Sequence, residues 1–369
     1  MWGIGVPHTF ESTLRHLPLI HPPIAFTLPP GAMRSHESEA NIMIATLIAI
    51  AITVILVVIA LPFAMVLWPW NAAPDPAEGL EFDAVEHMQA EPLPTQVQAM
   101  RDGYPMVLRR LDGPEGGPLV VMIHGSAWNG MQLEGLGAQI AQHADVLIPD
   151  LRGHGAAPGR RGDVDYIGQL EDDLADLITA RAKPGQQVIL LGYSSGGGLV
   201  VRFAGGPHGA MMQRAVLIAP FLQHDAPTTR PESGGWALPN VKRIIGLSIL
   251  DGFGIRAFNS YPVLRFAMPE TVLEGRYGAM ATPEYSFRLN ASLSPRRDWK
   301  ADITELPPFL LIAGTRDEAF RSEAYEPTIS TLNPKGQYRL LPDKTHLEIV
   351  DADETAEAVV GFVRGVGVE

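Results

Sequence analysis

The segment Gly192-Tyr193-Ser194-Ser195-Gly196 combines residue types that suit nucleophilic catalysis. It follows the apolar run 188–191 and precedes another apolar stretch, an order that predicts a strand, a sharp turn and a helix. A serine at such a turn has strained backbone, and bulky side chains two positions away would collide with neighbouring backbone. The glycines at 192 and 196 meet this need, so Ser194 is the predicted nucleophile. The alternative is a glycine turn that only lets a strand and a helix approach closely.

A serine hydroxyl is a weak nucleophile at neutral pH and needs a general base, for which His346 is the candidate. This histidine lies in the segment 343–348, which follows the weak strand candidate 338–341 and precedes a helix expected at 352–363. A loop in that position can present an imidazole to the serine, so His346 is predicted to remove the proton from Ser194.

An acid should hold the histidine in the correct tautomer, and Asp317 follows the expected strand 309–313. Glu318 and Asp302 are rivals for this role. Glu318 is expected to point to the opposite side of a turn, and Asp302 precedes the strand. The order serine, acid, histidine along the chain favours Asp317.

Serine catalysis also needs hydrogen-bond donors for the oxyanion that develops in the transition state. The backbone N–H of Ser195, at the start of the expected helix, is predicted to be one donor. The second is expected in the loop after the strand 119–123, where the backbone N–H of Ser126 is chosen. His124, in the same loop, is interpreted as a packing residue.

The C-terminal part of the chain, from residue 101 to 369, alternates short apolar runs with longer amphipathic stretches. This pattern predicts a mostly parallel sheet covered by helices on both faces. Helices are expected at 167–180 and 199–204. The interval from about 221 to 303 has no comparable strand run and is interpreted as an inserted cap. The expected strands are 119–123, 146–149, 188–191, 215–218, 309–313 and 338–341.

Residues 42–68 contain no charged side chain and are long enough to cross a hydrocarbon core of about 30 Å. The segment is too long for the apolar part of a cleaved signal peptide, and it has no polar side that a soluble helix would turn to water. A transmembrane helix is therefore predicted here. Residues 69–100, rich in Pro, Ala and acidic residues, are expected to form a linker with little chemistry.

The basic residues around residues 42–68 predict the orientation of the chain in a membrane. Arg34 precedes this segment closely, whereas the first basic residue after it is Arg101. The N-terminal segment 1–41 is therefore expected in the cytoplasm and the large domain outside it, which in a Gram-negative cell means an inner-membrane protein facing the periplasm. Met33 is expected to be the true translation start, so residues 1–32 are expected not to be made.

Composition excludes several classes of function. The 369 residues carry a formal net charge of −13 and form no basic stripe, which argues against binding to nucleic acid. The chain contains no cysteine, so thiolate chemistry and disulfides are excluded. The remaining histidines have no metal-ligand spacing and no dinucleotide or P-loop motif occurs, so neither a metal nor a cofactor is expected. The sequence gives no indication of the oligomeric state.

The loop Asp150-Leu151-Arg152-Gly153-His154-Gly155 joins the motif around Ser194, Asp317 and His346 in a recognisable set. With this set, the chain from about residue 101 onwards resembles the α/β-hydrolase superfamily, and within it the group of monoacylglycerol lipases, lysophospholipases and S33-type serine aminopeptidases. The resemblance implies an α/β-hydrolase fold with an inserted cap, here preceded by one transmembrane helix, and a cofactor-free enzyme that acts through an acyl-enzyme. It also implies that Asp150 and Arg152 are structural. The matching residues are His124-Gly125, Asp150-Leu151-Arg152-Gly153-His154-Gly155, Gly192 to Gly196, Asp317 and His346.

The favoured function is the cleavage of a small-molecule or lipid carboxylic ester next to a membrane. The apolar cap stretch 241–255 is a candidate to hold an acyl chain. One alternative is an aminopeptidase, in which Glu232, Glu270 or Glu274 would bind the substrate ammonium. Another alternative is a binding protein on a hydrolase fold that has lost its activity.

Overall fold

The structure is a computed structural model that describes residues 30–70, 73–76, 79–82 and 92–365. It divides into two compact units, Met1–Ile59 and Ala60–Glu369, and the second is called the C-terminal unit below. The expected start at Met33 concerns residues 1–32, most of which lie outside the described part of the chain.

Helix α1, Pro30–Val66, contains the apolar helix that the sequence predicts at 42–68, but it begins earlier, at Pro30. Its part from Ser38 to Val66 is long and apolar enough to cross a membrane, and none of its most apolar stretch is buried. The helix ends two residues before the predicted limit at Trp68. Pro69 accounts for the difference, because a proline disfavours helical backbone at the residue before it.

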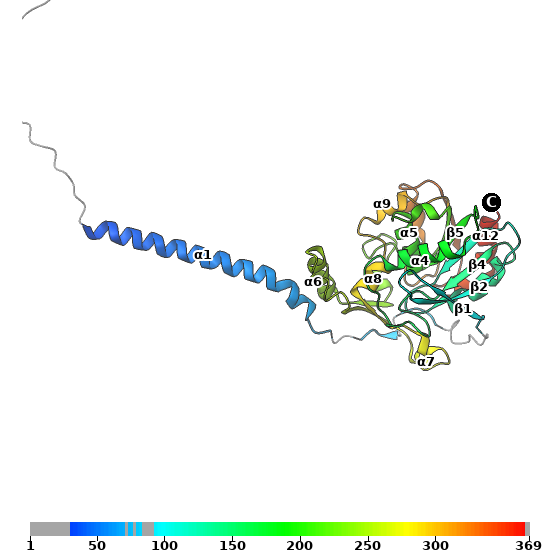
Figure 1. The fold of residues 1–369 in the computed structure, drawn as a ribbon, viewed down its shortest axis with the longest axis horizontal. Helices are drawn as coiled ribbons and strands as arrows, with labels where there is room; N and C mark the ends of the chain where they lie inside the picture. Colours follow the sequence, from blue (N-terminus) through cyan, green and yellow to red (C-terminus); the bar gives the residue numbers. More distant parts are fainter. Residues whose placement is uncertain (1–29, 71–72, 77–78, 83–91, 366–369) are drawn as a thin grey trace, which may run out of the picture. The chain divides into compact units, whose positions relative to one another are not determined.

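The C-terminal unit is built on an eight-stranded sheet with the order β1-β2-β4-β3-β5-β6-β10-β11 (Figure 1). Strands β1 and β2 pair antiparallel, β2 pairs antiparallel with β4, and the other neighbours are parallel. The strands are Thr95–Ala99, Pro105–Leu111, Leu119–Ile123, Asp145–Pro149, Val188–Tyr193 and Arg214–Ile218 for β1 to β6, Phe309–Gly314 for β10 and Gly336–Leu341 for β11.

All six strands predicted from apolar runs are present, with ends that differ by at most two residues. Every residue of β3, β4, β5 and β10 is buried, because helices cover both faces of the parallel part of the sheet. Strands β1 and β2 were not predicted, and β1 lies inside the segment 69–100, so the expected linker extends too far towards the C-terminus. Most of β1 is exposed, and it therefore lacks the apolar run that marks the central strands.

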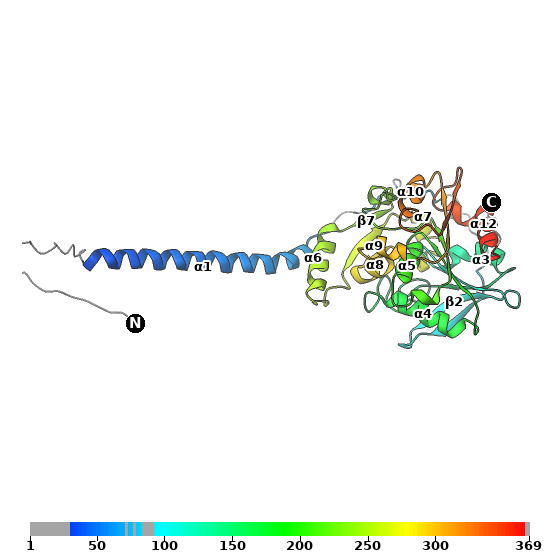
Figure 2. The same ribbon diagram turned by 90° about the horizontal axis from the view of Figure 1, so that it is seen from above.

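Helices pack around the sheet in two groups. Helix α3 packs against α12, and the two lie side by side in Figure 2. Helix α4 packs against α5, which also contacts α8 and α9. The helices of this unit are Glu134–Ile140, Gln169–Arg181, Ser195–Ala204, Val241–Gly252, Glu270–Leu273, Phe287–Leu293, Trp299–Thr304, Tyr325–Ile329, Glu348–Asp351 and Asp353–Val363 for α3 to α12.

The interval between β6 and β10 forms the cap that the sequence predicts, and it contains α6 to α9. The cap also contains a three-stranded antiparallel sheet of β7, Ala237–Pro239, β8, Pro262–Phe266, and β9, Glu284–Ser286. These strands are short and partly exposed, so no continuous apolar run predicts them.

Candidate active site

Ser194 occupies the sharp turn between β5 and α5. Its φ of 54° and ψ of −121° lie in a region that L residues rarely adopt, which agrees with the strain expected of a nucleophile elbow. The two glycines are needed because the turn is crowded. A Cβ atom on Gly192 would come within 2.3 Å of the Gly196 carbonyl oxygen, and one on Gly196 within 2.3 Å of the Ile123 carbonyl oxygen.

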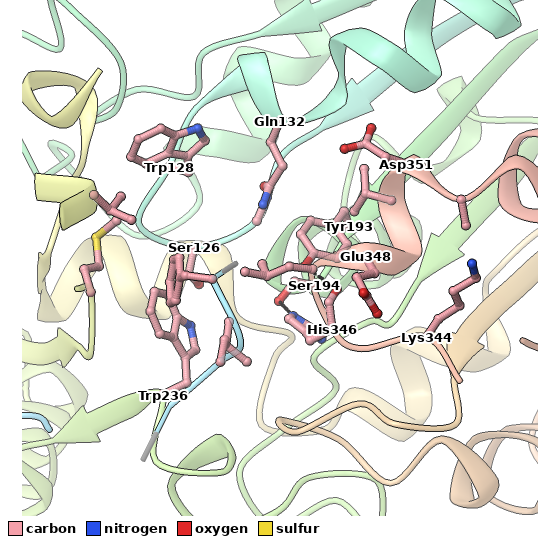
Figure 3. Close-up of a pocket in the computed structure, with 18 residues that line it drawn as sticks. Ser126, Trp128, Gln132, Tyr193, Ser194, Trp236, Lys344, His346, Glu348 and Asp351 are labelled. Atoms are coloured by element: carbon pink, nitrogen blue, oxygen red, sulfur yellow. Dashed lines mark hydrogen bonds between the residues drawn. The ribbon is translucent and has the colours of Figure 1, made fainter. Parts of the chain in front are cut away.

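The structure brings Ser194, His346 and Asp317 together in one hydrogen-bonded row. Ser194 and His346 are drawn in Figure 3. His346 Nε2 lies 3.0 Å from Ser194 Oγ, and His346 Nδ1 lies 2.8 Å from Asp317 Oδ2. All three side chains are buried or nearly so. They meet because β5, β10 and β11 are parallel, so the loops after these strands lie at one edge of the sheet.

The second carboxylate oxygen of Asp317 explains how this side chain is held. Asp317 Oδ1 accepts hydrogen bonds from the backbone N–H groups of Ala319 at 2.9 Å and Phe320 at 2.8 Å. These two bonds orient the carboxylate so that Oδ2 faces the imidazole of His346. The carboxylate therefore has a defined direction before any substrate binds.

The rival acids have other contacts. Glu318 Oε2 accepts from the backbone N–H of His346 at 2.8 Å, and Glu318 Oε1 accepts from the backbone N–H of Glu81 at 2.9 Å. Asp302 accepts from Arg296 Nη1 at 2.7 Å. Neither carboxylate faces the imidazole, so Glu318 supports the loop of His346 and Asp302 belongs to a separate ion pair.

Ser126 and Ser195, whose backbone N–H groups were predicted as oxyanion donors, lie next to each other. The hydroxyl of Ser126 donates to Ser195 Oγ at 2.8 Å. Ser195 is the first residue of α5, where a backbone N–H has no partner within the helix. Gly125 lets the loop approach closely, because a Cβ atom there would lie 3.2 Å from Ser194 Cβ.

A chain of hydrogen bonds holds the loop that contains Ser126. The next residue, Ala127, has a φ of 65° and donates its backbone N–H to the hydroxyl oxygen of Tyr285 at 2.7 Å. The Tyr285 hydroxyl donates in turn to His154 Nε2 at 2.6 Å, and His154 Nδ1 faces the Arg152 carbonyl oxygen at 3.2 Å. A residue of cap strand β9 therefore fixes the backbone beside Ser194.

His124 has a packing role, as predicted. Its Nε2 accepts from the backbone N–H of Leu151 at 3.1 Å, so its Nδ1 carries the proton and donates to the Gly125 carbonyl oxygen at 2.8 Å. Both nitrogens of a neutral imidazole are thereby satisfied. Burial lowers the pKa of His124 to about 4 and that of His154 to about 3. Both rings are therefore neutral at neutral pH.

Asp150 and Arg152, expected to be structural, have partners away from Ser194. Asp150 Oδ1 accepts from the backbone N–H of Gly130 at 2.8 Å and from Arg109 Nη1. Arg152 binds both carboxylate oxygens of Asp173, at 2.8 and 2.9 Å. These buried pairs join the loop after β4 to β2 and α4.

A cavity of about 320 Å³ opens beside Ser194 and His346 (Figure 3). One part of its wall is apolar, and the other part is polar. The apolar part contains Leu80, Phe82, Trp128, Trp236, Met268 and Val272, and the polar part contains Gln132, Lys344, Glu348 and Asp351. A substrate with an apolar portion and a polar portion fits such a wall.

Sequence reasoning missed most of this wall. Leu80 and Phe82 come from the segment that was expected to be a linker with little chemistry. The available signal was weak: Leu80 and Phe82 are large apolar residues in the proline-rich and acidic part of that segment. Trp236, Met268 and Val272 come from the cap. The sequence pattern there does not predict which side chains face the cavity.

Two expectations about the cap are not met. The stretch 241–255, proposed to hold an acyl chain, does not line the cavity. Glu270 and Glu274, proposed to bind a substrate ammonium, do not line it either, and the side chain of Glu232 lies outside the described part of the chain. The carboxylates that line the cavity are Glu348 and Asp351, which come from α11. Burial raises the pKa of Asp351.

Among the described residues, no group of three or more His, Asp or Glu side chains is arranged to hold a metal ion. Ser194, His346 and Asp317 are hydrogen-bonded to one another, and Ser126 is hydrogen-bonded to Ser195. The chemistry that this arrangement supports directly is the transfer of an acyl group to a serine hydroxyl.

Three known proteins are similar to this chain in sequence or in fold. Uncharacterized protein Rv2715 of Mycobacterium tuberculosis is 33% identical over 88 residues, which cover 24% of this chain and only 25% of that protein. The structure of a bacterial membrane phospholipase A matches with a TM-score of 0.54 and 17% identity, over 88% of this chain and 99% of the other. A soluble variant of monoglyceride lipase from Saccharomyces cerevisiae matches with a TM-score of 0.57 and 15% identity, over 76% of this chain and 97% of the other.

The two structural similarities concern the fold, since their sequence identity is low. A match to a family model covers more than half of the chain. The model of the alpha/beta hydrolase family matches residues 120–358, which include the elbow at Ser194, Asp317 and His346. On this match, and with the sheet order and the cap described above, the chain belongs to the alpha/beta hydrolase family.

Proposed function

We propose that the protein is a membrane-anchored serine hydrolase that cleaves carboxylic esters through an acyl-enzyme. The observation that carries this proposal is the imidazole of His346, which bridges the hydroxyl of Ser194 and the carboxylate of Asp317 beside an open cavity. A buried row of this kind is the arrangement that activates a serine hydroxyl at neutral pH.

In the first step Ser194 Oγ attacks the ester carbonyl carbon, and its proton passes to His346 Nε2. Asp317 stabilises the imidazolium that forms and keeps Nδ1 protonated. The backbone N–H groups of Ser126 and Ser195 bind the oxyanion of the tetrahedral intermediate. When the intermediate collapses, His346 donates its proton to the leaving alcohol oxygen. Water then attacks the acyl-enzyme with the same base, and Ser194 is released.

The apolar wall of the cavity supports an ester with a hydrocarbon portion as substrate. Trp128, Trp236 and Phe82 offer large apolar surfaces next to Ser194, and Lys344 and Gln132 offer polar contacts on the other side. Two proteins of similar fold are described as a phospholipase A and a monoglyceride lipase, which act on lipid esters. We therefore favour a lipase or lysophospholipase type of reaction.

Helix α1 is the proposed anchor, with residues 38–66 crossing the membrane. The distribution of basic residues, with Arg34 before the span and none until Arg101, supports a location of the C-terminal unit outside the cytoplasm. In a Gram-negative cell this is the periplasmic side of the inner membrane.

A fluorophosphonate probe tests the nucleophile directly, because it reacts with an activated serine and needs no knowledge of the substrate. The purified full-length protein should be labelled, Ser194→Ala should not, and the control Ser330→Ala, at the end of α10, should be labelled as the wild type is. Absence of labelling of the wild type, or equal labelling of Ser194→Ala, would contradict the proposal and favour a binding protein without activity.

An aminopeptidase is the second candidate, since Glu348 and Asp351 in the cavity wall could bind an ammonium group. Rates on p-nitrophenyl esters of increasing acyl length, compared with rates on aminoacyl-naphthylamides, separate the two activities. Faster turnover of the longer esters would support the lipase type of reaction. Turnover of the amides alone would establish the peptidase.

A further inference from the structure

The cap helix α6, Val241–Gly252, has two apolar faces. One face, with Gly246, Leu247 and Leu250, is buried in the C-terminal unit. The other consists of Val241, Ile245, Ile249 and Phe253, with exposed fractions of 56%, 44%, 37% and 81%. A spacing of four residues places these side chains in one row along the helix. In Figures 1 and 2, α6 lies at the edge of the C-terminal unit, away from α12.

The buried face of α6 packs against the last turns of α1, within the same compact unit. Val66 is buried in a cluster with Leu247 and Leu250, and Phe63 packs against this cluster. Gly246 allows the close approach, since a Cβ atom there would lie 2.7 Å from the carbonyl oxygen of Pro62.

Polar contacts strengthen this junction. Arg243 Nε donates to the carbonyl oxygen of Val66 at 2.9 Å, and Arg243 Nη2 donates to that of Trp68 at 3.3 Å. The guanidinium thereby satisfies carbonyl groups that the end of a helix leaves without partners. The ammonium of Lys242 lies 3.5 Å from the centre of the Trp68 ring. These contacts hold α6 at the C-terminal end of the apolar segment.

We propose that the row Val241, Ile245, Ile249 and Phe253 is a membrane-docking face that lies in the surface of the same phospholipid leaflet from which α1 emerges. The inference rests on the proposed anchoring by α1. A helix that contacts the last turns of a membrane span lies at the depth where the span leaves the hydrocarbon, so its outward face meets lipid rather than bulk water.

Three observations favour a lipid surface as the occupant. The first turn of α6 contacts the exposed Trp68 through Lys242 and Arg243, and tryptophan is typical of the membrane–water interface. Lys242 and Arg256, at the two ends of the helix, can reach anionic headgroups. Phe253, the most exposed residue of the row, also has the side chain that gains most from burial in lipid.

The docking face is connected directly to the cavity. Trp236 lines the cavity, the short strand β7 follows it, and Asn240 caps the start of α6. The cap therefore joins the leaflet surface to the wall of the site over a few residues.

The absence of cysteine allows a direct test, because each introduced cysteine is the only one in the chain. The full-length variants Phe253→Cys, Leu56→Cys and Glu115→Cys are labelled with an environment-sensitive fluorophore and reconstituted into phosphatidylethanolamine–phosphatidylglycerol vesicles. Quenching by spin-labelled lipids is then measured. Leu56 lies in the proposed span, and Glu115 is exposed before β3, at the end of that strand opposite to the site. Ile249→Cys provides a second position if Phe253→Cys fails to fold.

We expect blue-shifted emission and lipid quenching for labels at Phe253 and Leu56, and neither for the label at Glu115. Quenching at Leu56 without quenching at Phe253 and Ile249 would overturn the docking face but leave the anchor intact. A label at Phe253 that is shielded from aqueous iodide but not quenched by lipid would indicate a second copy of the chain and also overturn the proposal. No quenching at Leu56 would refute the anchor and the docking face together.

Discussion

His346 is held from several directions by residues that do not react. Its backbone carbonyl oxygen accepts from the Tyr193 hydroxyl at 2.7 Å, and its backbone N–H donates to Glu318 at 2.8 Å. Burial keeps the pKa of Tyr193 well above its ordinary value, so this hydroxyl stays protonated and remains a donor. With Asp317 on Nδ1, the ring has little freedom apart from the hydrogen bond to Ser194.

Replacement of the proposed acid should affect catalysis far more than replacement of its neighbour. Asp317→Asn cannot hold the imidazole in the required tautomer, so we expect kcat to fall by about 10³ to 10⁴ with little change in KM. Glu318→Gln keeps an acceptor for the His346 backbone N–H and should lose about tenfold or less. Steady-state kinetics on a p-nitrophenyl ester measure both. A similar loss in the two variants would mean that Asp317 has been assigned incorrectly.

The two buried histidines predict a pH dependence of stability. Burial lowers the pKa of His124 to about 4 and of His154 to about 3, whereas both titrate near 6.5 in the unfolded chain. Below pH 6.5 the unfolded state therefore binds more protons than the folded state. The free energy of unfolding should fall as the pH decreases towards 4, by about 1.4 kcal/mol per pH unit for each histidine.

Urea unfolding in detergent between pH 7 and pH 4.5 measures this dependence. His154→Gln retains an acceptor for the Tyr285 hydroxyl but cannot titrate. The slope of its unfolding free energy against pH should therefore be smaller than that of the wild type by about 1.4 kcal/mol per pH unit. Equal slopes for the variant and the wild type would show that His154 does not contribute.

At the scale of the elements, the turn between β5 and α5 depends on glycines packed against backbone. Gly196→Ala would place a Cβ atom 2.3 Å from the carbonyl oxygen of Ile123, which cannot move away because it belongs to a buried central strand. We expect a loss of stability of about 3 kcal/mol or more, measured by thermal unfolding.

The matched control for this change is Gly252→Ala. This glycine ends α6 with no atom near the position of a Cβ, and alanine favours helix. Its effect on the unfolding temperature should be close to zero. A large loss in the control, or a small one in Gly196→Ala, would argue against backbone crowding as the reason for glycine in the elbow.

The elements that could be predicted from the sequence are those with a strong pattern. The buried runs of β3, β5 and β10 and the motif around Ser194 mark the central sheet and the site because full burial leaves a continuous apolar signal. Strands β1 and β7 to β9 are short or exposed on one side, so burial leaves no such signal in them. The wall of the cavity depends on how the cap packs against the rest of the fold, and a local sequence pattern does not predict such tertiary contacts.

At the scale of the whole molecule, topology decides which side of a membrane contains the reaction. Alkaline phosphatase fused after residue 369 is active only when it is exported, and we expect activity in a Gram-negative host because the basic residues precede the span. A fusion to green fluorescent protein at the same position should show no fluorescence. An inactive phosphatase with a fluorescent counterpart would reverse the proposed orientation.

The residues that follow α1 do more than connect it to the fold. Leu80 and Phe82 line the cavity, and Glu81 between them donates its backbone N–H to the carboxylate that supports the loop of His346. A protease that cut the chain after Phe82 would release a soluble domain without these residues. If α1 anchors the chain as proposed, this cut would damage the site as well as free it from the membrane, and we expect the released form to be less active than the full-length protein.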